Sequence, residues 1–105
     1  MATITANQGI VTQINVFTVS PENQQALIEL LQEAARFASQ IPGWISASIH
    51  RSLDGTRVVN YAQSRDLDSA QRIIDALRGS GWLDRNKTLG EAHPGLYEVV
   101  FTSQT

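Results

Sequence analysis

The dipeptide Asp54-Gly55 lies between two strand-like segments, residues 44–53 and 56–65, and limits the fold more than any other feature of the sequence. Asp-Gly favours a two-residue turn that joins antiparallel strands. A turn at this position also fixes which residues face each other across the hairpin. The predicted pairs are Leu53 with Thr56, Ile49 with Asn60, Ala47 with Ala62, and Ile45 with Ser64.

The predicted register divides the hairpin side chains between two faces, because paired residues share a face. One face is mostly small and apolar, and we expect helices to cover it: Ile45, Ala47, Ile49, Leu53, Val58, Asn60, Ala62 and Ser64. The opposite face is mixed: Trp44, Ser46, Ser48, His50, Val59, Tyr61 and Gln63.

The rest of the chain alternates strand and helix patterns around the hairpin. The predicted elements are a strand at 10–19, a helix at 21–40, the two hairpin strands, a helix at 67–78 and a strand at 96–103. Asp66 is placed to cap the second helix, and Gly79 to end it. Residues 79–94 are rich in glycine and proline and are expected to be irregular.

The element order β-α-β-β-α-β predicts the ferredoxin-like α+β fold, with a four-stranded antiparallel sheet and both helices on one face. At 105 residues the chain is expected to form one domain, 1–105, in which residues 1–9 are a flexible tail.

The composition narrows the function. The formal net charge is −2 and no basic run occurs, which argues against nucleic acid as a partner. The chain has no cysteine and only two histidines, so neither a thiolate nucleophile nor a metal site is expected. No apolar run is long enough for a membrane span, and the first residues do not resemble a signal peptide. We therefore expect a soluble cytoplasmic protein.

Apolar residues on the second hairpin face, Trp44, Val59 and Tyr61, lie where two helices cannot reach. A solvated sheet face would show a cleaner polar alternation. A second copy of the chain would cover this face economically, which predicts a homodimer.

The helix-covered face lacks bulk around Asn60, since Ala47, Ala62 and Ser64 are small. A concave apolar space with a few placed polar groups is typical of a small-molecule site. The alternative is that the helices fill the gap and the Asn60 amide bonds to a loop carbonyl.

The segment "PGWISASIHRSLDGTRVVNYAQSRD", residues 42–66, resembles the antibiotic biosynthesis monooxygenase family, and "INVFTVSPENQQALIELL" does so more loosely. The resemblance implies a dimeric α+β barrel, with a pocket between each sheet and its own helices. It also implies oxidation of an aromatic phenol by O2 with no metal, flavin or haem cofactor. In members that act on polycyclic phenols the motif reads Asn-Tyr-Ala-Gln-Trp, and its Asn and Trp line the pocket. Asn60 matches that Asn, whereas Ser64 replaces the Trp.

These arguments select Asn60 as the catalytic residue, because its amide could donate a hydrogen bond to a phenolic or keto oxygen. The candidate substrate-binding residues are Asn15, Ile49, Ala62, Ser64, Trp82 and Arg85. Trp82 is considered as a replacement for the aromatic wall missing at Ser64, and Arg85 as a cation at the pocket mouth. His50 is expected on the opposite face, and no general base is assigned.

Two other functions remain open. A haem-degrading relative of the same fold needs a histidine near the end of the second helix, where this chain reads "GSGWLDRNK". A dimeric binding protein without catalysis would also fit, with Ser64 marking the lost activity. Oxygen uptake with a dihydroxy-aromatic compound would separate these possibilities.

Overall fold

The computed structural model describes residues 4, 6 and 8–105, so the predicted tail at 1–9 lies partly outside the described residues. The elements are β1 (Val11–Val19), the 3₁₀ turn η1 (Pro21–Asn23), α1 (Gln24–Ala38), β2 (Trp44–Arg51), β3 (Arg57–Ser64), α2 (Leu67–Gly79), α3 (Trp82–Lys87) and β4 (Gly90–Glu98). In the described part, no helix is long and apolar enough to cross a membrane.

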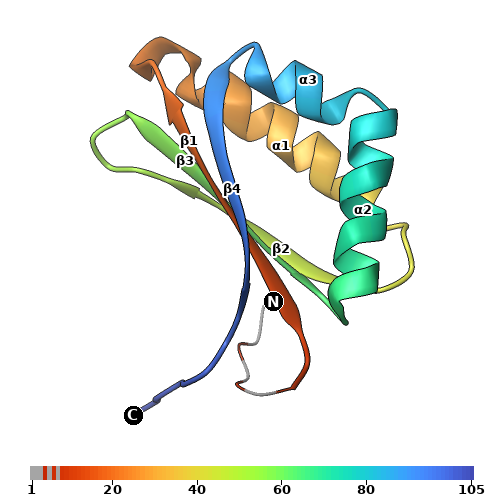
Figure 1. Ribbon diagram of the computed structural model, residues 1–105. Coiled ribbons are helices and arrows are strands. Elements are labelled where there is room, and N and C mark those ends of the chain that lie inside the picture. The colour runs from red at the N-terminus through yellow and green to blue at the C-terminus, as the bar shows by residue number, and fades with distance from the viewer. Residues whose placement is uncertain (1–3, 5, 7) are drawn as a thin grey trace.

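The four strands form one antiparallel sheet in the order β2-β3-β1-β4, and all three helices lie on one side of it (Figure 1). This confirms the predicted ferredoxin-like α+β fold. The predicted first helix is divided, because Pro21 begins a 3₁₀ turn before α1 starts at Gln24. The Asp66 carboxylate caps α2 by accepting a hydrogen bond from the Ser69 N–H at 2.8 Å, as expected.

The hairpin register is confirmed over most of its length: Ile49 pairs with Asn60 and Ala47 with Ala62. The predicted register is wrong at the end of the hairpin that lies away from the turn. A β-bulge between Trp44 and Ser46 pairs Trp44, instead of Ile45, with Ser64. Because a bulge adds one residue to a strand, the alternation of faces changes there. Trp44 therefore lines the helix-covered face, contrary to the prediction, and Ile45 is 42% exposed.

The chain that leads into this bulge is held by the first turn of α2. Gly43 has a φ of 95°, and a Cβ at this position would collide with the Ser69 side chain. The Arg65 N–H donates to the Gly43 carbonyl at 2.8 Å. Gly43 thus lets the chain approach α2 closely just before Trp44. At the other end of the hairpin, Leu53 was expected under the helices but lies fully exposed in the turn.

The predicted bounds of the last strand, 96–103, are wrong by several residues, because β4 spans Gly90–Glu98. The segment 79–94, expected to be irregular, contains α3 and the first half of β4, and residues 99–105 continue beyond the sheet without regular structure. The first half of this strand was missed because proline is rare inside strands, yet Pro94 pairs with Asn15 within β4. β4 is an edge strand, where a missing N–H on the open side costs no ladder hydrogen bond.

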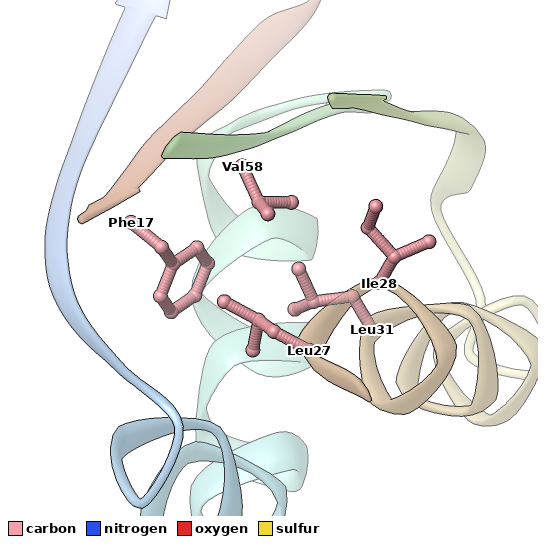
Figure 2. Packing of buried hydrophobic residues seen from close by; sticks show 5 residues of the cluster. All are labelled: Phe17, Leu27, Ile28, Leu31 and Val58. Carbon is pink, nitrogen blue, oxygen red and sulfur yellow. The ribbon is translucent and has the colours of Figure 1, made fainter. Parts of the chain in front are cut away.

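The hydrophobic core occupies one end of the helix-covered face. Phe17 of β1 and Val58 of β3 pack against Leu27, Ile28 and Leu31 of α1 (Figure 2). All five are buried, and the large side chains of α1 fill this end. The same face is lined by smaller and more polar residues toward the other end of β1 and β3, which is where the cavity lies.

Candidate functional site

A cavity of about 470 Å³ opens between the sheet and the pair α2 and α3, and we call it the outer compartment. Strands β1 and β4 supply its floor, including Gln13, Asn15 and Leu96, and the helices supply Ile74 and Leu83. Its size is in the range of pockets that hold drug-sized molecules.

A narrower space of about 50 Å³ continues from it, between the sheet and the helices α1 and α2, and we call it the inner compartment. Trp44, Ala47, Asn60, Ala62 and Ser64 line its sheet side. The two compartments meet at residues that line both: Gln13, Asn15, Phe17, Ile74, Leu83 and Asn86. The two spaces are therefore parts of one site.

Asn15 and Asn60 are direct cross-strand partners, and both face this site. The sequence did not determine which residues of β1 face the helices. The pairing of β1 with β3 places the two amides side by side on the helix-covered face. The Asn15 Oδ1 accepts a hydrogen bond from the His93 N–H of β4 at 3.1 Å. The Asn60 Oδ1 is buried and has no hydrogen-bond partner among the described residues. A buried amide oxygen without a partner is costly, so the Asn60 Oδ1 is an acceptor that a ligand in this site can satisfy.

A third amide, Asn86 of α3, was missed by the sequence analysis. Its side chain is 4% exposed, it lines both compartments, and its Oδ1 also lacks a partner in the described part of the chain. Asn86 lies in the segment that was expected to be irregular, so no periodic pattern marked it. The site therefore holds amides from three elements, β1, β3 and α3.

Aromatic surface in the inner compartment comes from Trp44, directly opposite Ser64. Trp82, the predicted substitute for an aromatic at Ser64, lines neither compartment. Its ring packs against Phe37 with centroids 6.1 Å apart, and the guanidinium of Arg85 lies 3.9 Å above it. Arg85 is thus stacked on Trp82 and is absent from the cavity wall.

Of the other three predicted substrate-binding residues on the hairpin, two line the cavity and one does not. Ala62 and Ser64 line the inner compartment as expected. Ile49 pairs with Asn60 but packs against the hydrophobic core, and it does not line the cavity. His50 lies on an exposed part of β2, where it shares a 3.0 Å hydrogen bond with the Ser48 hydroxyl. None of the described histidines lines either compartment.

Charged side chains are confined to the outer compartment. Arg78, Asp84 and Lys87 line it, whereas the inner compartment has no charged lining residue among those described. Arg78 is held by Asp75, with 3.1 Å between Nη1 and Oδ1. The interior is accordingly apolar with neutral amides, and the charges lie on the α2 and α3 side of the opening.

Comparison with known proteins agrees with this architecture. Residues 10–72 match the family described as antibiotic biosynthesis monooxygenase. The chain belongs to this family, which confirms the resemblance inferred from the sequence.

Among individual relatives, a tetracenomycin-F1 monooxygenase from Streptomyces glaucescens is 46% identical over 66 residues, which are 62% of this chain and 59% of the relative. The aligned region thus spans little more than half the length of that relative. The crystal structure of an ActVA-Orf6 monooxygenase from Streptomyces coelicolor, in complex with nanaomycin D, has a TM-score of 0.76 and 26% identity, with 92% of each chain covered. A mutant of SnoaB, a cofactor-independent oxygenase from Streptomyces nogalater, has a TM-score of 0.79 at 23% identity, with 90% of this chain and 96% of that chain covered.

Proposed function

We propose that the protein is a cofactor-independent monooxygenase that oxidises a phenol- or quinol-type aromatic molecule with O2. The observation that supports this most directly is the cavity itself, in which the unpartnered Asn60 Oδ1 and the neighbouring Asn15 amide lie at the inner end of a space whose outer part has room for an aromatic molecule. The relatives support the reaction type, because proteins named as monooxygenases and as a cofactor-independent oxygenase share this family or fold.

The reaction needs no group beyond the two substrates. A phenol loses its hydroxyl proton, and the electron-rich ring transfers one electron to O2. The radical pair then forms a carbon–oxygen bond, which gives a peroxide at a ring carbon that still bears hydrogen. Loss of that ring proton breaks the O–O bond and forms the second carbonyl of a quinone. The other oxygen atom leaves with the two protons as water, so one phenol and one O2 give one quinone and one water.

The protein's part is to bind the ring, to stabilise its anion and to exclude water. In the proposed site the Asn60 amide N–H₂ donates to the phenolate or to the developing peroxide oxygen. Its Oδ1 accepts from a substrate hydroxyl, which satisfies the buried oxygen that has no partner here. Asn15 and Asn86 orient the same polar edge of the ring. Ala62 and Ser64 line only the inner compartment, beyond the ring, whereas Ile49, Trp82 and Arg85 line neither compartment.

The deciding experiment is oxygen uptake with purified, metal-depleted protein and a dihydroxynaphthalene. We expect consumption of one O2 per quinone formed, with no flavin or haem absorbance in the protein. Tight binding of the aromatic without oxygen uptake would instead identify a non-catalytic binding protein. Stoichiometric haem binding would point to the haem-degrading alternative.

Assembly is a second part of the proposal. The sheet face opposite the helices carries the half-buried Val59 and Tyr61, and we expect a second copy of the chain to cover it. Trp44, which the sequence placed on this face, belongs to the cavity. Tyr61→Glu should dissociate the dimer in light scattering, because it would bury an unpaired charge. Leu53→Glu in the exposed hairpin turn is the control and should leave assembly intact. A monomeric wild-type protein would contradict the proposal.

A further inference from the structure

The inner compartment is too small for the ring that the outer compartment can hold. Its volume is about 50 Å³, against about 470 Å³ outside. An apolar protein cavity that binds benzene measures roughly 150 Å³, and one water needs roughly 10–15 Å³. The inner compartment therefore has room for a molecule of a few atoms. The ring of an aromatic substrate has to remain in the outer compartment, and only an oxygen substituent at its edge reaches Asn60.

The lining of the inner compartment is unusually rich in methyl groups. Alanines from four elements face it: Ala34, Ala35 and Ala38 of α1, Ala47 of β2, Ala62 of β3 and Ala70 of α2. Methyl groups offer no hydrogen bonds, and apolar cavities of this kind stay dry and take up apolar molecules such as xenon. The methyl groups favour a small, uncharged and apolar ligand in this part of the space, whereas the unpartnered oxygens of Asn60 and Asn86 accept hydrogen bonds at its edge.

The polar residues of the inner compartment lie on the sheet and α3, and the lining residues from α1 and α2 are all apolar: the polar ones are Gln13, Asn15, Asn60, Ser64 and Asn86. Asn60 lies on its sheet wall, and Asn15 and Asn86 lie at the junction with the outer compartment. An O2 molecule needs no hydrogen bond, but its reduced forms are anions that an amide N–H₂ stabilises. The amides thus stand where charge would develop on a reduced oxygen molecule.

We propose that the inner compartment is the O2-binding site, separated by Asn15 and Asn86 from an aromatic subsite in the outer compartment. The assignment rests on the proposed monooxygenase function, because it makes O2 the ligand. It places the ring carbon that is oxidised at the junction, in contact with both compartments. The inner compartment then holds O2 next to that carbon and leaves no room for a second ring.

Xenon tests the cavity without any need for catalysis. In crystals of the wild-type protein under xenon pressure, we expect xenon between Ala47, Ala62 and α1. The variant Ala62→Val should remove it, since the added methyl groups fill the space, and Ala47→Val serves if Ala62→Val fails to fold. The control is Ala92→Val, the same change in a strand residue that lines only the outer compartment, and it should retain xenon.

Kinetics tests the ligand. With a dihydroxynaphthalene as substrate, Ala62→Val should raise the KM for O2 by about tenfold and leave the KM for the aromatic unchanged. Ala92→Val should change the KM for the aromatic and leave that for O2 unchanged. The opposite pattern in Ala62→Val, a changed aromatic KM with an unchanged O2 KM, would show that the ring enters the inner compartment and would overturn the assignment.

The two proposals fail in different ways. Oxygen uptake by the wild-type protein without xenon in the inner compartment would overturn the O2 site and leave the monooxygenase function standing. Xenon in the inner compartment without oxygen uptake by the wild-type protein would overturn both the function and the assignment of O2. The compartment would then be a site for small apolar molecules alone.

Discussion

The two ends of the helix-covered sheet face are built from the same three elements and have opposite character. At the core end, β1 contributes Phe17, β3 contributes Val58 and α1 contributes Leu27, and none is more than 2% exposed. At the cavity end, the same strands contribute Asn15 and Asn60, and α1 contributes alanines. On each strand, the bulky apolar residue and the asparagine are only two positions apart. Bulk at one end stabilises the fold, and the lack of bulk at the other end makes room for a ligand.

The largest difference between the ends should appear on truncation of leucine. Leu27→Ala removes a completely buried side chain and should lower the free energy of unfolding by about 2–5 kcal/mol. Leu83→Ala is the matched change at the cavity wall, where the side chain already borders open space, and should cost clearly less. Urea unfolding of both variants measures the difference, and equal losses would contradict the division into two ends.

The two asparagines of the cavity end should respond differently to the same substitution. Asn15→Leu removes the acceptor of the His93 N–H and should lower the free energy of unfolding by about 1–3 kcal/mol. Asn60→Leu removes an oxygen without a partner, so stability should change little or rise. Ligand affinity or turnover should nevertheless fall about tenfold or more in Asn60→Leu. Unfolding and binding measured on both variants test this, and a destabilised Asn60→Leu that binds normally would remove Asn60 from the site.

The smallest effect concerns the hairpin turn at the core end. Hydrogen bonds from the Thr56 side chain and backbone, with one from Ser52, lower the pKa of Asp54 to about 2 from its ordinary value of 3.8. A lowered pKa means that the ionised carboxylate stabilises the fold above the unfolded-state pKa, and that this contribution disappears as the pH falls from about 4 to about 2. Asp54→Asn should therefore flatten the stability profile in this range.

The cavity end has a counterpart in Asp66, whose pKa is also lowered, first by the hydrogen bond from the Ser69 N–H. Because the pKa of Asp66 is also lowered, its ionised carboxylate stabilises the fold and this contribution is lost on acidification. Asp66→Asn should therefore also reduce the loss of stability at acidic pH. Acid titration of urea unfolding compares the two variants, and an unchanged profile in both would show that the two carboxylates do not act through these hydrogen bonds.

How far the sequence predicted the molecule depends on how local each signal was. The Asp-Gly turn and the alternation on either side are local, so the pairing of Ile49 with Asn60 was predicted correctly. The bulge at Ile45 follows directly after Gly43, which lies against α2, and such a tertiary contact is not visible in the pattern of a single strand. The inward position of Trp44 was missed for this reason.

The missed parts of the site have a related cause. The first half of β4 was predicted as irregular because of Gly90 and Pro94, and the edge position of β4 makes the proline acceptable. Asn86 stands just before this strand in a short helix with few apolar residues. Asn15 was identified as a candidate, but its side of the sheet was fixed only by its pairing with Asn60.

The bulge at Ile45 makes the register of a strand, as well as the identity of its residues, a determinant of the shape of the cavity. If the same residues formed a regular strand without the bulge, Ile45 would pair with Ser64 and Trp44 would lie on the uncovered face, although the sequence was unchanged. A single irregular pair at one end of the hairpin therefore decides whether an indole or a smaller aliphatic side chain closes this part of the cavity.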